Sequence, residues 1–421
     1  MEYLLPYGRK KISLNLPEKH VLRILEPKET QKLESLEKTV AEKIARPDEG
    51  PSLEEILEAK KPSTVAIIVN DLTRSTPTAS MLPPVLEVLE KRGVARKNVV
   101  IVIATGTHRG LTEEEKARVV GAEVLASYRV ENHDCDAPDL VSLGTLSTGN
   151  EVLINPLVAK ADCRIALGEV LLHYYAGFAG GRKSILPGVA GRDTVMRNHA
   201  MMVHPRASLA RIDDNPLSLE MVEALKLCPL DCIVNCIANS HKEIVAVVAG
   251  DAEKAWKKGT EIFYDVNSLS LEEKADVLFV SAGGYPKDIN MYQAHKAVEI
   301  SSRALKEGGS LVLFAELEEG YGHPVYEEWA NKNLSPAEVE EAMTKGIVFG
   351  AHKLFFLGRI ARRHSLHLYS SQNETFAKKS FFSPVESLES LLSLLEKKHG
   401  PNYRSYVLPQ GGIVLPLVKE K

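Results

Sequence analysis

A glycine-rich stretch at residues 173–189, HYYAGFAGGRKSILPGV, holds a histidine and a lysine ten positions apart. Glycine lets a backbone approach a ligand closely, and a lysine held by such a loop becomes a nucleophile when burial lowers its pKa. The stretch is not a phosphate-binding P-loop, in which the lysine directly follows the last glycine, because Arg182 separates Gly181 from Lys183. Two interpretations of Lys183 remain: a covalent attachment point, or a lysine paired with a surface carboxylate.

Two histidines follow apolar runs that we expect to form buried strands. His108 lies in TGTHRG at residues 105–110, and His173 follows CRIALGEVLL at residues 163–172. Imidazole titrates near neutral pH, so two imidazoles facing one cavity suit a reaction that works from either side of a carbon atom. Each histidine alone is compatible with a structural role. As a pair beside Lys183, they are predicted to be catalytic acid/bases.

The segment NDLTRSTP at residues 70–77 follows a third apolar run and carries an acid and an arginine three positions apart. Asp71 can orient a histidine, and the guanidinium of Arg74 can bind a planar carboxylate through two parallel hydrogen bonds. The alternative is a turn closed by Asp71 and Arg74 themselves.

Two predicted helices carry further candidates. In GRDTVMRNHAMMVHP, His199 and His204 are five residues apart and miss the four-residue spacing that places two ligands on one helix face. His199 is therefore predicted to be a single ligand to a metal held mainly by another group, or else a histidine at a packing surface. In DINMYQAHKAVE, Gln293 and Lys296 share a face of the first turn, close to Tyr292, where the lysine can contact a carboxylate.

The elements that must position these residues alternate between strand and helix patterns. The β-branched run at residues 64–70 is followed by a helical pattern, TASMLPPVLEVLEKRG, and then by the apolar run NVVIVIATG. This alternation predicts a mostly parallel sheet with helices on both faces, and ligands in such folds bind beyond the carboxyl ends of the strands. A second such unit is predicted from a strand at 276–281, a helix at 291–307 and a strand at 310–315.

We therefore predict an α/β protein with two domains, residues 1–269 and 270–421, each built on a mostly parallel sheet flanked by helices. The active site is expected in the cleft between them. In the first domain, CPLDCIVNCIANSHKEIVAVVAGD predicts a β-hairpin in which Cys232 and Cys236 are buried thiols on one strand face. The Glu/Lys-rich segment near residues 30–60 is interpreted as solvated helix.

Composition limits the classes of partner. The 421 residues are 44% hydrophobic and carry a net charge of −4, which gives no electrostatic reason to expect nucleic acid or an anionic membrane as a partner. The first residues lack the apolar core of a signal peptide, no stretch has the length and apolarity of a membrane span, and five cysteines are too few for a disulfide framework. A cytoplasmic location is expected.

The segments DLTRSTP, TGTHRG, HYYAGFAGGRKSILPG, NHA and DINMYQAHK, in this order and at these separations, resemble the nickel-dependent lactate racemase family. The resemblance runs from about residue 65 to residue 300. It implies a nickel-pincer nucleotide cofactor, Ni(II)-pyridinium-3,5-bisthiocarboxylate mononucleotide, covalently attached at Lys183, with His199 completing the nickel coordination. It also implies that enzymes of cofactor biosynthesis are needed for activation.

The same resemblance implies roles for the remaining candidates. His108 and His173 are the expected acid/bases, and the cofactor is expected to lie against residues Asp71, Leu72, Thr73 and Arg74. Arg74, Tyr292, Gln293 and Lys296 are expected to contact the substrate. The implied reaction is racemisation of a small 2-hydroxy acid, in which the α-hydrogen passes reversibly to the cofactor as hydride.

Lactate is the expected substrate, and malate or a longer or aromatic 2-hydroxy acid is the alternative. His295 keeps a diacid open, because a second cationic residue near the site favours one. Two other classes of protein are compatible with the residues. One is a zinc metallohydrolase that uses His108, His173 and His199. The other is a non-catalytic protein that binds a nucleotide-like ligand.

Overall fold

The computed structural model describes residues 1–419, and the chain divides into two compact units. Unit 1 contains Met1–Glu29 and Asn267–Lys421, and unit 2 contains Thr30–Val266. The division at Val266 lies near the expected boundary, but the first 29 residues differ from the expected assignment to the N-terminal domain. The reason is strand pairing: β3 (Val21–Ile24) joins β19 (Ser405–Leu408) as a parallel neighbour.

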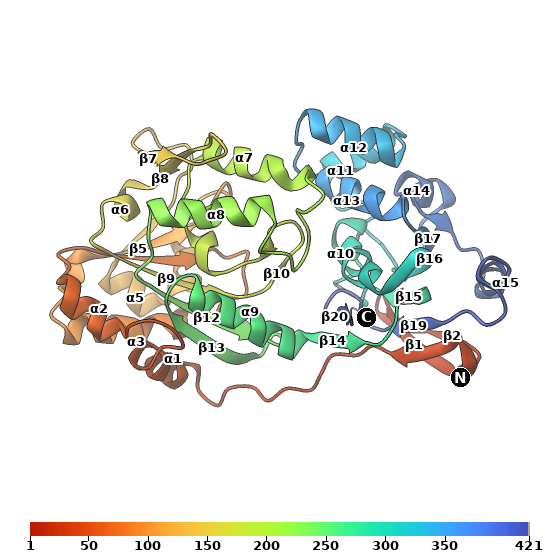
Figure 1. The fold of residues 1–421 in the computed structure, drawn as a ribbon, viewed down its shortest axis with the longest axis horizontal. Helices are drawn as coiled ribbons and strands as arrows, with labels where there is room; N and C mark the ends of the chain where they lie inside the picture. Colours follow the sequence, from red (N-terminus) through yellow and green to blue (C-terminus); the bar gives the residue numbers. More distant parts are fainter. Residues whose placement is uncertain (420–421) are drawn as a thin grey trace. The chain divides into compact units, whose positions relative to one another are not determined.

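Unit 2 is built on a six-stranded sheet with the order β13-β12-β9-β4-β5-β6 (Figure 1). The strands are β4 (Val65–Asn70), β5 (Val99–Ala104), β6 (Arg129–Asn132), β9 (Cys163–Glu169), β12 (Cys232–Ala238) and β13 (Ile244–Gly250). All neighbours are parallel except β12 and β13, which form the predicted antiparallel hairpin. The predicted mostly parallel architecture is confirmed.

Short antiparallel pairs and helices complete unit 2. The pairs are β7 (Val141–Thr145) with β8 (Glu151–Ile154), and β10 (Leu172–His173) with β11 (Gly177–Phe178). The helices are α1 (Leu36–Ala45), α2 (Leu53–Lys60), α3 (Thr78–Lys91), α4 (Glu113–Val120), α5 (Ala122–Ser127), α6 (Pro156–Ala159), α7 (Arg192–Ala200), α8 (Pro216–Leu227) and α9 (Lys254–Asn267).

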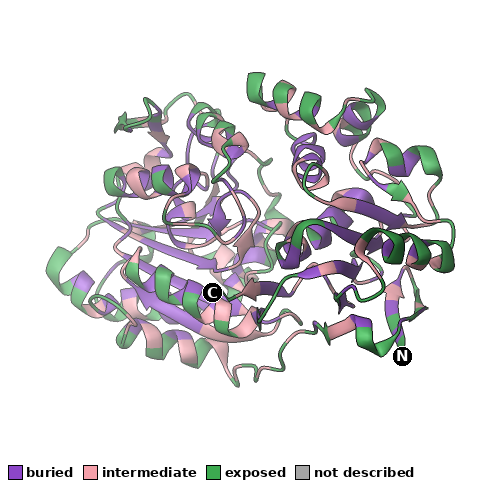
Figure 2. Cartoon of the chain, turned by 45° about the vertical axis from the view of Figure 1, so that its right-hand side comes forward, coloured by how far each residue is buried: buried purple, intermediate pink, exposed green. Residues whose placement is uncertain are grey.

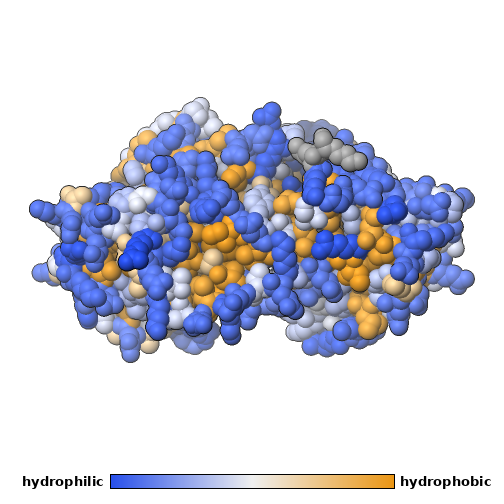
Figure 3. Space-filling model, turned by 60° about the horizontal axis from the view of Figure 1, so that its bottom comes forward, coloured by the Kyte–Doolittle hydropathy of each residue, from blue (hydrophilic) through white to orange (hydrophobic). Residues whose placement is uncertain are grey.

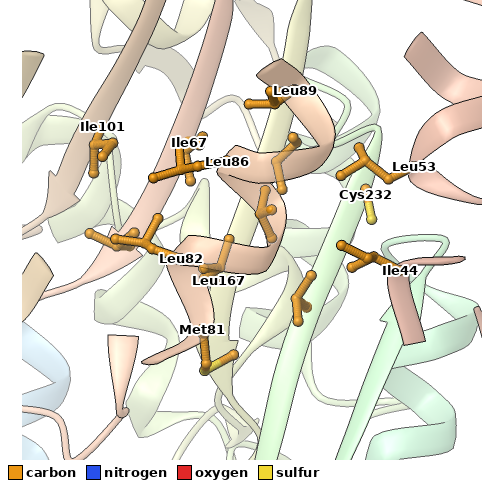
Figure 4. Packing of buried hydrophobic residues seen from close by; sticks show 14 of the residues in the cluster. Ile44, Leu53, Ile67, Met81, Leu82, Leu86, Leu89, Ile101, Leu167 and Cys232 are labelled. Carbon is orange, nitrogen blue, oxygen red and sulfur yellow. The ribbon is translucent and has the colours of Figure 1, made fainter. Parts of the chain in front are cut away.

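The core of unit 2 lies between one face of the sheet and the helices α1 to α4. Ile67, Ile101 and Leu167 point from three neighbouring strands toward Leu82 and Leu86 of α3 (Figure 4). On the opposite face α9 packs closely, since a Cβ on its Gly259 would lie 2.9 Å from Val170 and 3.0 Å from Val248. Helices therefore cover both faces, and the strands of the sheet are buried (Figure 2).

The Glu/Lys-rich segment near residues 30–60 differs from the expected solvated helix. It forms two helices, and Val40 and Ile44 of α1 are buried in the core together with Leu53 of α2. Ser52 begins α2 with a capping box, in which its hydroxyl accepts from the Glu55 amide and the Glu55 carboxylate accepts from the Ser52 amide. The charged residues cover only the outer faces of these helices.

Unit 1 contains a second six-stranded sheet, with the order β18-β17-β16-β15-β19-β3, in which every pair is parallel. Its other strands are β15 (Ala275–Ser281), β16 (Leu305–Phe314), β17 (Ser365–Tyr369) and β18 (Ser383–Pro384). Two-stranded pairs are formed by β1 (Glu2–Tyr7) with β2 (Lys10–Asn15), and by β14 (Ser268–Leu271) with β20 (Leu415–Val418). The helices are α10 (Met291–Ser301), α11 (Pro324–Asn331), α12 (Pro336–Lys345), α13 (His352–Ala361), α14 (Glu374–Lys379) and α15 (Leu388–His399).

The predicted β-α-β unit of residues 276–315 is present, with one shifted boundary. The helix ends at Ser301 rather than at residue 307, and the following strand begins at Leu305 rather than at residue 310. Leu305 pairs with Ala275 before the register shifts, so pairing with β15 draws these residues out of the helix.

Large hydrophobic side chains on the surface are few and scattered. They include Leu4, Leu219 and Tyr285, and the face shown in Figure 3 is mostly hydrophilic with smaller hydrophobic areas. Among residues 1–419, no helix combines the length and the apolarity needed to cross a membrane.

The burial of side chains in unit 2 predicts that two leucines in helices contribute differently to its stability. Leu82→Ala, at a fully buried position, is expected to lower the free energy of unfolding of unit 2 by about 3 kcal/mol, through lost burial and the cavity that remains. Leu219→Ala, at a position that is 50% exposed, is expected to cost less than about 1 kcal/mol. Urea denaturation in a Trp329→Phe background measures both, because Trp256 then reports on unit 2 alone. Equal losses would contradict this assignment of the core.

Candidate functional site

The candidate residues of unit 2 follow the carboxyl ends of three adjacent parallel strands. Residues 71–74 follow β4, residues 105–108 follow β5, and β9 leads within three residues to β10 and His173. From β4 the chain first builds the sheet outward through β5 and β6, and then returns to the other side of β4 with β9 and β12. The site therefore lies at the point where the strand order reverses, which is where parallel α/β sheets bind ligands.

Asp71 and His108 form a close pair across the ends of β4 and β5. The Asp71 Oδ2 atom lies 2.7 Å from His108 Nδ1, and the hydroxyl of Thr73 donates to Asp71 Oδ1 at 2.6 Å. Burial raises the pKa of the Asp71 carboxyl, but the hydrogen bonds from His108 and Thr73 and the charges of His108 and Arg74 outweigh it and lower that pKa. An ionised Asp71 accepts a hydrogen bond from the Nδ1–H group of His108. The Nε2 atom of His108 is then left to interact with a substrate.

Asp71 thus orients a histidine, as one of the two sequence interpretations predicted. A turn is also present, because the Arg74 amide donates to the Asp71 carbonyl at 3.2 Å. The Arg74 side chain is exposed and forms none of the ion pairs found in residues 1–419, so it is available to an anion. Leu72 is also exposed.

A small pocket of about 170 Å³ lies beside the Asp71–His108 pair. It is lined by Asp71, Leu72, Thr73, His108, Arg109, Leu111 and Glu115. Arg109 is held away from a ligand by a two-pronged ion pair with Glu115, with distances of 2.7 and 2.6 Å. The His108 side chain is 51% exposed, and it is the only imidazole among the residues that line this pocket.

The glycine-rich loop packs tightly onto the ends of β9 and β12. Gly180 has φ +82°, and a Cβ there would lie 2.8 Å from the Asn235 side chain and 3.0 Å from the Glu169 carbonyl. Gly181 has φ +52°, and a Cβ there would lie 2.8 Å from the Trp256 ring. Both positions therefore require glycine, and the tight packing fixes the short 3-10 turn at Gly181–Ser184 that carries Lys183.

Lys183 lies in a strongly desolvated, positively charged environment. Burial, followed by the charges of Arg74 and Arg182, lowers the pKa of its amine well below the usual value. None of the ion pairs in residues 1–419 includes Lys183, so the interpretation as a lysine paired with a surface carboxylate is wrong. A neutral amine is the nucleophilic form.

Arg182, the residue that breaks the P-loop pattern, is itself buried. Its guanidinium stacks 3.8 Å above the Trp256 ring and donates to the hydroxyl of Ser218 at 2.9 Å. Arg182 thus anchors the loop to the interior of unit 2, while the next residue, Lys183, remains partly exposed. In the sequence Arg182 only excludes a P-loop, and its anchoring role depends on tertiary contacts with Trp256 and Ser218 that local spacing does not indicate.

His173 is held by the tight turn between β10 and β11. Its Nδ1 atom accepts from the Ala176 amide at 3.3 Å, and its ring lies 4.5 Å from Tyr175. Burial, followed by the charges of Lys183, Arg74, His199 and Arg182, lowers its pKa well below the usual value. The Tyr175 ring also contacts His199 edge-on at 5.3 Å, so one tyrosine lies against both histidines.

Tyr292, Gln293 and Lys296 belong to unit 1, whereas all the residues above belong to unit 2. They lie in the first two turns of α10, and the Lys296 ammonium donates to the side-chain oxygen of Gln293 at 2.8 Å. The predicted shared helix face is confirmed by this contact. His295 is buried, and its pKa is well below the usual value through burial and then the charges of Lys353, Lys296 and His352.

Residues that can together hold a metal ion occur in one place within residues 1–419. One potential ligand atom from each of Asp134, Cys135 and Asp136 lies within 4.8 Å of the other two, but Asp136 forms a two-pronged ion pair with Arg192 at 2.7 Å. His108, His173 and His199 do not converge into such a group. The geometry therefore does not support the three-histidine zinc site of a hydrolase, whereas His199 can still supply one nitrogen ligand to a metal held by another molecule.

Comparisons with known proteins agree for both halves of the chain. Residues 7–210 match the model of the lactate racemase N-terminal domain, and residues 271–415 match that of the lactate racemase C-terminal domain. A lactate racemase of Thermoanaerobacterium thermosaccharolyticum is 31% identical over 99% of each chain. One of Lactiplantibacillus plantarum is 33% identical over 68% of each chain.

Solved structures are similar as well. The lactate racemase apoprotein from Thermoanaerobacterium thermosaccharolyticum matches with a TM-score of 0.86 and 30% identity over the full length of both chains. A protein from Thermotoga maritima shares the fold, with a TM-score of 0.62 and 17% identity over 92% of this chain and 100% of its own.

The environment of Lys183 predicts unusual reactivity in the protein without any cofactor. In trace acylation with acetic anhydride, Lys183 is expected to reach half of its maximal labelling rate at a lower pH than the exposed Lys97, because burial and nearby cations favour the neutral amine. Peptide mass spectrometry over a pH series measures both midpoints. In the urea-unfolded chain the two midpoints should coincide, and coincidence in the folded chain would contradict the prediction.

Proposed function

This chain belongs to the lactate racemase family and is a racemase, and we propose that it interconverts the enantiomers of a small 2-hydroxy acid, lactate in the first instance. We further propose that it does so with a nickel-pincer nucleotide attached at Lys183. When bound, this cofactor supplies a site that accepts the α-hydrogen of the substrate as hydride and returns it. The observation that supports the proposal is that two oriented histidines and one desolvated lysine follow neighbouring strand ends at the switch point of the unit 2 sheet.

The residues of unit 2 fit such a cofactor. The Lys183 amine has a lowered pKa and no carboxylate partner, which suits covalent attachment to an acyl group. His199 presents an imidazole, a ligand type that suits nickel, from the end of α7. In the segment Asp71, Leu72, Thr73 and Arg74, the last three residues are exposed and Asp71 is buried, and we propose that the cofactor lies against this segment. Loading requires the enzymes that synthesise the cofactor, which are proposed as activating partners.

The two histidines are proposed to move the hydroxyl proton on opposite sides of the substrate. His108 is oriented through Nδ1 by the ionised Asp71, so its Nε2 faces the proton to be moved. His173 has no such carboxylate, and its lowered pKa makes it a neutral base before the substrate binds. One histidine accepts the proton as the C–H bond breaks, and the other donates a proton when hydrogen returns to the opposite face.

Arg74 is proposed to bind the substrate carboxylate, and Tyr292, Gln293 and Lys296 to add contacts from unit 1. Arginine suits this role because its fork matches the two carboxylate oxygens. Burial, followed by the charges of Lys353, Lys296 and His352, lowers the pKa of His295 well below its usual value, so His295 itself does not supply a cation for the second carboxylate of a diacid. Lactate is therefore proposed first, with malate as the alternative.

The proposed activity predicts the effect of each histidine separately. Protein produced together with the cofactor-synthesising enzymes should convert L-lactate to D-lactate. Chiral chromatography of the two enantiomers measures this conversion. His108→Gln and His173→Gln should each lower kcat by about 10²- to 10⁴-fold, the usual contribution of a general acid/base. His241→Gln, at an exposed position in unit 2, is the control and should retain activity. Absence of D-lactate with the nickel-loaded protein would refute the proposed reaction.

Attachment at Lys183 predicts a mass difference that survives unfolding. Denatured wild-type protein from the same cells should carry an added mass on the peptide that contains Lys183, whereas Lys183→Ala should carry none and should purify with little nickel. Lys97→Ala controls for the loss of an exposed lysine and should retain the added mass. If Lys183→Ala kept both the mass and the nickel, the attachment site would lie elsewhere.

A further inference from the structure

Lys353 of α13 is a buried lysine for which the proposed reaction has no use. It is 5% exposed, and α13 packs against α10 within unit 1. The helix sequence around it, HKLFFLGRIA, is otherwise mostly apolar. Lysine is rarely buried without a partner, because the removal of an ammonium group from water is costly.

The contacts of Lys353 converge on one residue, Tyr292. Its Nζ atom donates to the Tyr292 carbonyl at 2.6 Å and lies 3.4 Å from the centroid of the Tyr292 ring. None of the ion pairs in residues 1–419 includes Lys353. Its positive charge is therefore stabilised by one hydrogen bond to a backbone oxygen and by one cation–π contact.

The carboxyl group that acts on Lys353 is that of Glu299, about two turns beyond Tyr292 in α10. Burial raises the pKa of Glu299 to about 8, although the charges of Lys353 and Arg303 act in the opposite direction. Its Oε2 atom lies 3.7 Å from Nε2 of His295. Because its pKa is raised, this carboxyl group offsets the charge of the lysine only in part near neutral pH.

The site of these contacts is the first turn of α10. The Asn290 side chain caps this turn by accepting from the Gln293 amide at 3.1 Å, and the Tyr292 ring stacks on His323 at 4.8 Å. Gln293 and Lys296 project from the same segment and are bonded to each other. Through its hydrogen bond to the Tyr292 carbonyl, the buried Lys353 thus fixes the backbone from which these two side chains project.

We propose that Lys353 is a positioning residue for substrate binding, which acts through Tyr292 to hold the first turn of α10 so that Gln293 and Lys296 are presented to the substrate. This inference rests on the proposed function, which assigns those side chains to the substrate. A methionine of similar length would fill the same space without burying a charge, so stability alone does not account for a lysine at this position.

The charge of Lys353 should change within the physiological pH range. Burial, followed by the charge of Lys296, lowers the pKa of Lys353 to about 7, while Glu299 raises it. The other titratable groups around it are Tyr292, His295, His323 and His352, and burial lowers the pKa of His352 to about 3. The ammonium form is lost as the pH rises through about 7, so the hold on Tyr292 weakens and KM for lactate should increase.

The test compares Lys353→Met and Lys353→Arg in the nickel-loaded enzyme. Lys353→Met should raise KM for L-lactate about tenfold, the loss expected for one charge-assisted hydrogen bond, with kcat changed by less than about threefold. Its melting temperature at pH 6 should be equal to or higher than that of the wild type, because a buried charge has been removed. Lys353→Arg should restore a low KM and flatten its rise between pH 6 and pH 8. Lys345→Met, at an exposed position of α12, is the matched control.

A purely structural role would give a different pattern. In that case Lys353→Met would lower the melting temperature. The variant would then show either a change in both kcat and KM or no change in either. An unchanged KM in a stable Lys353→Met variant would overturn the proposal.

Hydrogen exchange separates this inference from the proposed function, because it needs no turnover. The amides of the first turn of α10 should exchange faster in Lys353→Met than in the wild type, with no change in the α12 amides. If the wild type shows no racemisation, the proposed function fails while this comparison still decides the role of Lys353. Equal exchange in the first turn would overturn the role.

Discussion

The in-register parallel pairing of β4 with β5 and β9 is the constraint on which the candidate site depends. Val65 of β4 is level with Val99 of β5 and with Cys163 of β9, so the three strands end at nearly the same height. Their continuations therefore meet at one edge of the sheet, although up to about a hundred residues separate them in the sequence. A short hydrogen bond such as Asp71–His108 can form only because that register brings the two strand ends together.

Desolvation then gives the gathered side chains different chemical properties. His108 is exposed and bonded to an ionised carboxylate, whereas His173 is surrounded by Lys183, Arg74, His199 and Arg182 and lacks an acidic partner. The same cations act on Lys183. Burial, and after it the surplus of positive charge at this edge, lowers the pKa of the Lys183 amine and of the His173 imidazole, and the same surplus favours a ligand that carries negative charge.

Unit 1 uses the same physical means for a different purpose. Its sheet is also parallel, and a lysine is again buried without a carboxylate in an ion pair. In unit 2 the desolvated lysine remains partly exposed and is available for reaction, whereas Lys353 is enclosed and directs its charge to Tyr292. We propose that this difference in exposure, rather than residue type, separates the reactive role of Lys183 from the positioning role of Lys353.

The sequence by itself determined the features that depend on local spacing. The alternation of strand and helix predicted both parallel sheets, Arg182 excluded a P-loop, and the three-residue spacing of Gln293 and Lys296 predicted that they share a helix face. The tertiary structure decided what depends on long-range contacts. It placed β3 in the sheet of unit 1, ended α10 at Ser301, selected His108 as the partner of Asp71 and buried Lys353 against Tyr292. Periodicity reports which residues face a core, but the partner across that core is set by packing between segments distant in the chain, and a four-residue strand or a single lysine in an apolar helix carries no local sign of it.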